Sequence, residues 1–214
     1  MNSAPRIALI DDHPATLRAL RRLLTAEGFE VHSFESAEAL LQQSADLRYD
    51  CLLLDVNMPG RSGLDLQEQL AQDPEAPPIV FLTGRGDIPM TVRAMRRGAV
   101  GFLTKPVNDT DLLEAVRGAV AVAAQLKDQR AARAADRERL ARLTPREREV
   151  LSHLIAGKLN KQIAADLGTS EQTIKVHRMR IHEKSGLPSI AELVLIATRL
   201  GIVPSDGEAP CPPR

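Results

Sequence analysis

Short apolar runs alternate with amphipathic stretches through residues 1–124. The continuous runs have the length of strands and predict β-strands at 6–10, 29–34, 51–55, 79–83 and 100–104. Apolar side chains at helical spacing between them predict helices at 14–27, 36–47, 64–72, 88–98 and from 109 onward. Because the strands are apolar on both faces, both faces of the sheet must be covered. The pattern therefore predicts an α/β domain with a five-stranded, doubly wound parallel sheet of the flavodoxin type.

The helical pattern that begins at residue 109 extends beyond this domain. Its apolar positions fit a heptad seam at Leu112, Val116, Ala119, Ala123 and Leu126. Arginines then interrupt the seam at 130, 133 and 137. We expect residues 125–142 to form a helical linker with weak self-association, and the alternative is a flexible, charged, alanine-rich spacer.

A second, all-helical domain is expected over residues 143–203. Thr144 caps a helix, Pro145 fits its first turn, and Glu147 completes a capping box. Asn160 is expected to cap a short helix that Gly168 ends, and Thr169 or Ser170 to cap a third. Two short helices joined by a tight glycine-containing turn indicate a helix-turn-helix. The proline-rich residues 204–214 are expected to be a disordered tail.

Composition and charge agree with two domains that have different partners. Hydrophobic residues make up 43% of the chain but aromatic residues only 2%, so aliphatic side chains must build the cores and base stacking has few platforms. The net charge is −5 over residues 1–124, +3 over 125–143 and +2 over 144–214. The two cysteines indicate no disulfide framework, and neither a signal peptide nor a membrane span is expected. We therefore expect a cytoplasmic protein.

Polar side chains stand at the carboxyl ends of the predicted strands, where chemistry sits in such sheets. They are Asp11, Asp12, Asp55, Thr83 and Lys105. Three carboxylates in one pocket repel one another unless a hard cation such as Mg²⁺ neutralises them. With the metal bound, Asp55 can attack a phosphoryl group, while Lys105 and Thr83 contact the phosphoryl oxygens. Each residue alone is commonplace at a strand end, but the set indicates phosphoryl chemistry.

The segments LIDDH, LLLDVNMPG, FLTG and FLTKP resemble the receiver domain of two-component response regulators over residues 5–124. The resemblance implies that Asp55 accepts phosphate from a sensor histidine kinase. It also implies Mg²⁺ held by Asp12, Asp55 and the backbone carbonyl of Asn57, with Asp11 acting partly through water. Thr83 and Phe102 would be the switch residues, and residues 88–120 the output surface. Lys105–Pro106 is often cis in this family.

The third helix of the second domain has a face suited to the major groove. Ile174 and Ile181 are expected to point inward, with His177 beside them. The candidate base-reading positions are Gln172, Thr173, Lys175, Val176 and Met179. Phosphate contacts are expected from Lys158, Lys161, Arg178 and Arg180. The alternative is an ordinary solvated basic helix.

The segments LTPREREVL and AGKLNKQIAADLGTSEQTIKVHRMRIHEKSG resemble the LuxR-type helix-turn-helix, and TGRGDIPMTVRAMRRGAVGFLTKPV is similar to the FixJ-like branch. Met179 departs from the family, where a basic or polar residue is common. The resemblance implies a transcription regulator whose partners are a sensor histidine kinase, double-stranded DNA and RNA polymerase, and which forms a homodimer on phosphorylation. The last helix, SIAELVLIATRLG, either pairs with a second copy or is buried in its own domain.

Two other functions are compatible with parts of the pattern. A phosphatase or phosphotransferase with an aspartyl intermediate commonly needs an acidic residue two positions after the nucleophile, but this chain has Asn57 there. We therefore expect slow autodephosphorylation rather than turnover on outside substrates. A DNA-binding regulator with a vestigial receiver is the third possibility, and the intact set of pocket residues argues against it.

Overall fold

The computed structural model describes residues 4–43, 48–84, 88–187 and 189–202. The chain folds into two compact units, Met1–Lys127 and Asp128–Arg214. The expected tail at 204–214 lies outside the described residues. Within the described part, no helix combines the length and apolarity that crossing a bilayer requires.

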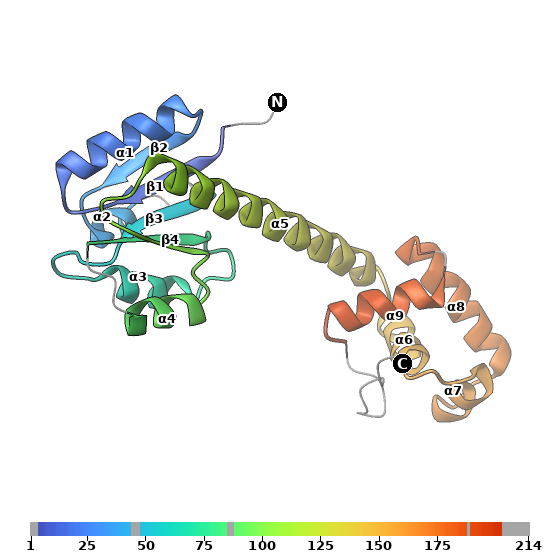
Figure 1. Ribbon diagram of the computed structural model, residues 1–214. Coiled ribbons are helices and arrows are strands. Elements are labelled where there is room, and N and C mark those ends of the chain that lie inside the picture. The colour runs from blue at the N-terminus through green and yellow to red at the C-terminus, as the bar shows by residue number, and fades with distance from the viewer. Residues whose placement is uncertain (1–3, 44–47, 85–87, 188, 203–214) are drawn as a thin grey trace. The chain divides into compact units, whose positions relative to one another are not determined.

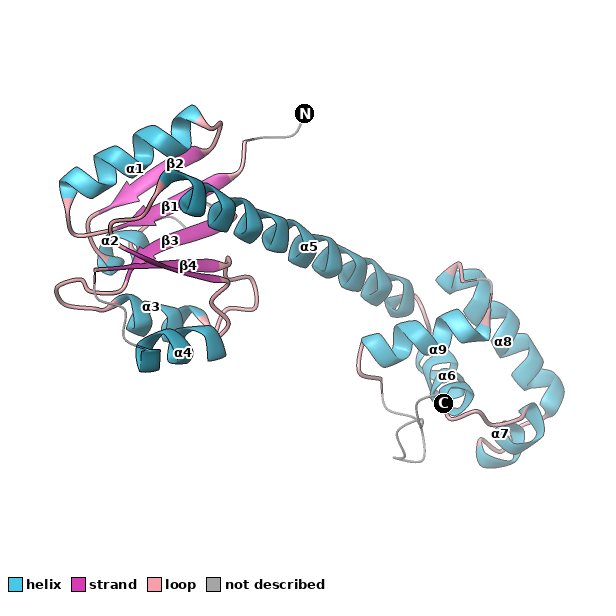
Figure 2. Cartoon of the chain, in the orientation of Figure 1, coloured by secondary structure: helices cyan, strands magenta, loops and turns pink. Residues whose placement is uncertain are grey.

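The first unit is a parallel sheet with helices on both faces (Figures 1 and 2). Its strand order is β2-β1-β3-β4-β5, with every pairing parallel. The strands are β1 Arg6–Ile10, β2 Glu30–Phe34, β3 Cys51–Asp55, β4 Ile79–Thr83 and β5 Gly101–Thr104. The helices are α1 Pro14–Ala26, α2 Ala37–Leu41, α3 Gly63–Leu70, α4 Ile88–Arg96 and α5 Asp109–Ala141. The predicted doubly wound α/β fold is confirmed.

Two apolar layers hold the helices on the sheet. On one face, leucines of α1 and residues Leu112, Val116 and Ala119 of α5 pack against β1, β3 and β4. On the other face, apolar residues of α2, α3 and α4 pack around Leu52, Leu54 and Phe81 of the central strands. The strands β3 and β4 are buried along their whole length, which is why their apolar runs are unbroken.

The thiol of Cys51, the first residue of β3, is fully buried. Burial, together with the nearby charge of Asp50, raises the pKa of this thiol to about 12. Cys51 is therefore a small core residue.

Helix α2 is shorter than the predicted helix at 36–47. Ser36 caps it, with Oγ accepting a hydrogen bond from the N–H of Ala39, and the helix ends at Leu41. The next residues, Gln42 and Gln43, are exposed and polar, so they add nothing to the buried face of a helix. Residues 44–47 lie outside the described part of the chain.

Helix α5 is continuous over 33 residues, so the segment 125–141 is helical rather than a flexible spacer. The division between the units falls inside it, after Lys127. Near its carboxyl end, Leu140 enters the core of the second unit. Asp136 is almost fully buried and pairs with Arg199 at 2.9 Å.

The second unit is all-helical, with α6 Pro145–Ile155, α7 Asn160–Asp166, α8 Glu171–Ser185 and α9 Ile190–Arg199. Thr144 and Glu147 form the predicted capping box, and Ser170 caps α8. Ile174 and Ile181 lie in the core, as predicted. Asn160 is not a cap: the cap position is Leu159, and Asn160 is the first helical residue, whose side-chain oxygen accepts a hydrogen bond from Arg178.

Candidate functional site

The candidate phosphoryl site lies where the central strands end. Asp11 follows β1, Asp55 is the last residue of β3, Thr83 the last of β4, and Lys105 follows β5. Parallel pairing brings these ends to one edge of the sheet, and the N–H of Lys105 donates to the carbonyl of Thr83 at 2.7 Å. The structure therefore gathers the predicted pocket residues at one place.

Lys105 bridges two buried carboxylates. Its Nζ lies 2.5 Å from Oδ2 of Asp11 and 2.6 Å from Oδ2 of Asp55. Asp11 is fully buried and Asp55 is 3% exposed. Burial by itself lowers the pKa of Lys105, but the hydrogen bonds and charges of the two carboxylates outweigh burial and raise it. Lys105 is therefore held as a cation beside the candidate nucleophile.

The acidic side chains leave an excess of negative charge that suits a metal. Asp11, Asp12, His13 and Asp55 offer ligand atoms that all lie within 4.8 Å of one another. Nδ1 of His13 lies 2.8 Å from Oδ1 of Asp12, a neighbour that the sequence pattern did not indicate. Three carboxylates face one lysine, and oxygen donors with surplus charge fit a hard divalent cation. The cluster could bind such a metal.

An open cleft of about 350 Å³ gives access to these groups. Its lining includes Asp55, Asn57 and Lys105, together with His13, Thr16 and Gly84. The N–H of Asn57 donates to Oδ1 of Asp55 at 3.0 Å, which fixes the carboxylate and leaves the Asn57 side chain exposed. A phosphoryl group can therefore approach Asp55 from solvent.

The two candidate switch residues differ in burial. Thr83 is fully buried, whereas Phe102 on β5 is half-buried. The ring of Phe102 lies 6.2 Å from that of Phe81, tilted by 49°. The Lys105–Pro106 peptide bond is cis.

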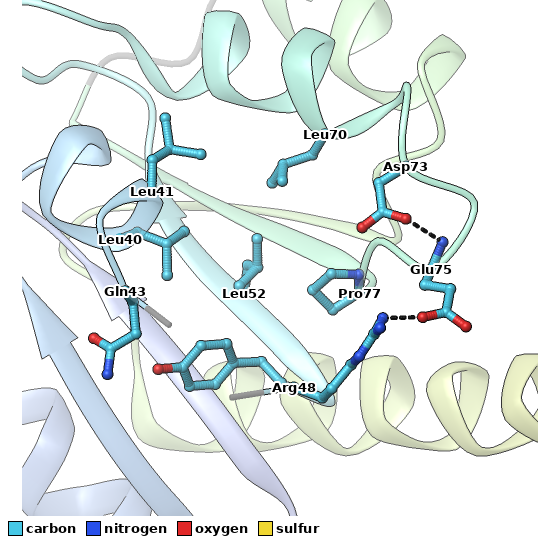
Figure 3. Close-up of a pocket in the computed structure, with 10 residues that line it drawn as sticks. Leu40, Leu41, Gln43, Arg48, Leu52, Leu70, Asp73, Glu75 and Pro77 are labelled. Carbon is cyan, nitrogen blue, oxygen red and sulfur yellow. Dashed lines mark hydrogen bonds and ion pairs between the residues drawn. The ribbon is translucent and has the colours of Figure 1, made fainter. Parts of the chain in front are cut away.

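A second cavity, of about 290 Å³, opens beside α2 and α3 (Figure 3). Leu40, Leu52 and Leu70 provide its apolar wall, and an ion pair between Arg48 and Glu75 lies at its side. Leu52 lies near the start of β3, at the other end from Asp55. This cavity is therefore separate from the acidic site.

Helix α8 presents most of the predicted DNA-contacting residues to solvent. The exposed ones are Gln172, Thr173, Lys175, Met179 and Arg180, and Lys161 on α7 is exposed as well. Val176 and Arg178 are half-buried. Met179 is 62% exposed, which is unusual for so apolar a side chain.

Two members of this set are engaged within the unit. The hydroxyl of Thr173 pairs with that of Ser170 at 2.9 Å, next to the cap of α8. Arg178 donates to Asn160 at 2.7 Å and so joins α8 to α7. Lys158, another expected phosphate contact, pairs with Asp166.

Sequence reasoning also missed Gly63, the first residue of α3. A Cβ at this position would overlap the backbone carbonyl oxygen of Asp55, so the start of α3 packs directly on the candidate nucleophile. A glycine after a turn is a common pattern, and only the tertiary contact gives it this meaning.

Comparisons with known proteins match both units. The model of the response regulator receiver domain matches residues 7–117, and that of the luxR family of bacterial regulatory proteins matches residues 141–197. The response regulator protein TmoT of Ectopseudomonas mendocina is 43% identical over 91% of this chain and 88% of its own. The transcriptional regulatory protein FixJ of Rhizobium meliloti is 39% identical over 93% and 98%. The solved structure of the response regulator StyR superposes with a TM-score of 0.76 at 41% identity, covering 92% of this chain and 99% of StyR.

Proposed function

Because the chain belongs to the two-component response regulators that join a receiver domain to a LuxR-type DNA-binding domain, we propose that Asp55 is its phosphate acceptor. The donor is the phosphohistidine of a sensor histidine kinase. The observation that supports this most strongly is the buried Asp55 carboxylate, which is held by Lys105 and opens to a cleft beside two further carboxylates. This function belongs in the cytoplasm, where DNA and the kinase domain are both accessible.

Mg²⁺ is the proposed cofactor, which Asp12, Asp55 and the backbone carbonyl of Asn57 would hold, with Asp11 acting partly through water. When bound, it neutralises the charge that develops on the phosphoryl oxygens. An oxygen of Asp55 attacks phosphorus, and the bond from phosphorus to the histidine nitrogen breaks. Lys105 then exchanges its contact with the Asp55 carboxylate for a phosphoryl oxygen, and the hydroxyl of Thr83 donates to another. Phe102 moves inward as Thr83 moves.

Asn57 limits this chemistry to a switch. Its amide has no acidic proton and cannot act as a general acid or base for hydrolysis of the acyl phosphate. The phosphoryl group is therefore lost only slowly by autodephosphorylation, and the protein does not turn over outside substrates.

Phosphorylation is proposed to favour a homodimer. A two-state receiver would offer the surface of α4 and β5, where Val92, Met95 and Val100 are exposed. Two helix-turn-helix units would then occupy half-sites roughly 34 Å apart. The dimer would act on transcription together with RNA polymerase.

On DNA, α8 is proposed to enter the major groove. Lys175 and Gln172 would donate to base edges, while Val176 and Met179 contact thymine methyl groups. The proposed phosphate contacts are Lys161, Arg178 and Arg180, with Thr173 beside the groove.

Intact mass spectrometry tests the phosphate acceptor directly. Incubation with Mg²⁺ and a small phosphodonor such as acetyl phosphate should add one phosphoryl group to the chain. The adduct should be lost without Mg²⁺ and in Asp55→Asn, whose circular dichroism should be unchanged. Equal adducts in the wild type and the variant would reject Asp55 as the acceptor.

A DNA-binding titration tests the placement of α8. We expect Lys175→Ala to cost about 1–3 kcal/mol at the specific site and to relax sequence preference. Lys161→Ala is the matched control, because loss of a phosphate contact weakens all sequences alike and reduces the salt dependence. A specific-site affinity and footprint that Lys175→Ala leaves unchanged would contradict this placement.

A further inference from the structure

Gln67 joins two helices of the receiver through a buried contact. The residue lies on α3 and is 2% exposed. Its side-chain nitrogen donates to the carbonyl of Ala94 at 3.0 Å and to that of Arg97 at 3.3 Å. Ala94 lies in the last turn of α4, where its carbonyl also accepts the N–H groups of Arg97 and Ala99, each at 3.2 Å, and Arg97 is the first residue after the helix. Gln67 therefore links α3 to the carboxyl end of α4 and to the residue that follows it.

The first turn of α3 is fixed to the phosphorylation site. The backbone of Gly63 packs against the carbonyl of Asp55, and its N–H donates to the carbonyl of Val56 at 3.1 Å. Ser62 and Asp65 close a capping box at this first turn. One turn separates this fixed end of α3 from Gln67, so α3 directly connects Asp55 with α4.

The amide of Gln67 is satisfied at only one end. Two carbonyl oxygens can only accept, so the nitrogen must face them, and within the described residues the buried side-chain oxygen has no hydrogen-bond partner. A leucine of similar size would fill this space without a lone buried oxygen. Stability alone therefore does not explain a glutamine here, whereas a contact that holds one of two arrangements does.

We propose that Gln67 is a positioning residue that holds α4 in the resting arrangement and releases it when Asp55 is phosphorylated. The inference rests on the proposed function of Asp55. The arrangement described is that of the free carboxylate, because Lys105 lies 2.6 Å from Asp55 Oδ2. The helix that Gln67 holds carries the exposed Val92 and Met95 of the proposed dimer surface. Gln67 thus biases the equilibrium between the resting and active receiver.

The test compares full-length Gln67→Leu with a neighbour on the same helix. Without phosphodonor, Gln67→Leu should dimerise and bind specific DNA about fivefold or more tightly than the wild type. Coupling between two sites is reciprocal at equilibrium. Wild type and Gln67→Leu should therefore differ less from each other in their response to phosphate when both are dimeric or DNA-bound than when both are free. Glu68→Gln is the matched control: Glu68 contacts Arg97, the residue after α4, through an ion pair of 2.9 Å at the surface, and its loss should leave both properties unchanged.

A second measurement needs no substitution that affects folding. In nuclear magnetic resonance spectra of the wild type, the side-chain N–H resonances of Gln67 should move and exchange faster with solvent once Asp55 is phosphorylated. Unchanged resonances, or a folded Gln67→Leu with wild-type affinity and dimerisation, would overturn the role of Gln67 while Asp55 phosphorylation stands. A wild type that takes no phosphate on Asp55 would overturn both proposals.

Discussion

Each unit of the molecule contains a lysine bonded to buried carboxylate oxygens, and the two sites differ in charge balance. In the receiver, Lys105 forms ion pairs with Asp11 and Asp55, and Asp12 and a cleft open to solvent lie beside them. In the second unit, Lys184 pairs with a single carboxylate, and its Nζ lies 2.9 and 2.8 Å from the two oxygens of Glu147.

The difference shows how to tell a reactive ion pair from a structural one. Glu147 has its charge balanced by Lys184 and accepts a further hydrogen bond from the N–H of Thr144, so no surplus negative charge is left for a cation. The receiver site has more carboxylates than cations and therefore retains affinity for a further positive charge. Surplus charge beside an accessible cleft, rather than burial alone, marks the functional site.

The largest expected effect is that of Lys105→Met, which leaves Asp11 and Asp55 buried without their cation. We expect the receiver to lose about 3 kcal/mol of stability in the absence of divalent metal, because an uncompensated buried charge is costly. Saturating Mg²⁺ should restore most of it. Hydrogen exchange of peptides from β1 and β3, with and without Mg²⁺, measures the effect. Protection that is indifferent to Mg²⁺ would argue against a metal site here.

Lys184→Met should destabilise the second unit by about 2 kcal/mol, less than a fully buried pair because the lysine side chain is 35% exposed. Mg²⁺ should give no recovery, since Glu147 stands alone. Arg142→Gln is the control, because its pair with Glu138 is exposed on both sides and should contribute less than about 0.5 kcal/mol. Thermal unfolding of the full chain, resolved by hydrogen exchange of α6 peptides, distinguishes these outcomes.

Gly63→Ala tests the close packing of α3 on the backbone of Asp55, for which the Lys184–Glu147 pair of the second unit has no counterpart. The added methyl group would overlap the Asp55 carbonyl and lie 3.1 Å from Leu54, so backbone must shift. We expect a loss of about 1–2 kcal/mol and slower phosphorylation. Gly118→Ala on α5 meets nothing within 4 Å and should instead stabilise by about 0.5–1 kcal/mol. Scanning calorimetry and the mass assay together would expose any departure from these opposite signs.

The last effect is absent at neutral pH and appears only in acid, where Glu147 titrates. Burial raises the pKa of this carboxyl, but Lys184 and the hydrogen bonds at Thr144 outweigh burial and lower it from 4.5 to about 2. A carboxyl with a lowered folded pKa contributes stability above its unfolded pKa and loses it as pH falls through the folded value. The second unit should therefore weaken between pH 4.5 and about 2, and Lys184→Met should weaken less over this range. Acid titration of α6 protection checks the slope.

Local pattern was sufficient to predict the sheet and the edge of the sheet that carries the candidate site. The strands β3 and β4 begin and end where predicted, because fully buried strands leave unbroken apolar runs between polar or proline boundaries. Once the strands are parallel, their carboxyl ends must meet, so the amino-acid pattern alone places Asp55, Thr83 and Lys105 together.

Side-chain pairs between distant segments could not be predicted in this way. Glu147 was identified from its capping box, but Lys184 is 37 residues away and nothing local connects them. The contact of Gln67 with the end of α4 likewise depends on how two helices meet across the sheet face. Asn160 has the composition of a cap, yet the helix starts one residue earlier than that role allows, and its amide serves Arg178 instead.

The buried thiol of Cys51 can report how often the central strand β3 opens. With a pKa of about 12 and no exposed surface, it cannot meet an alkylating reagent while β3 is in place. In a Cys211→Ser background, its modification rate would count only those openings that expose the strand ending at Asp55. The effect of phosphorylation, metal or DNA would then be measured as a change in the rate at which β3 opens and Cys51 is modified.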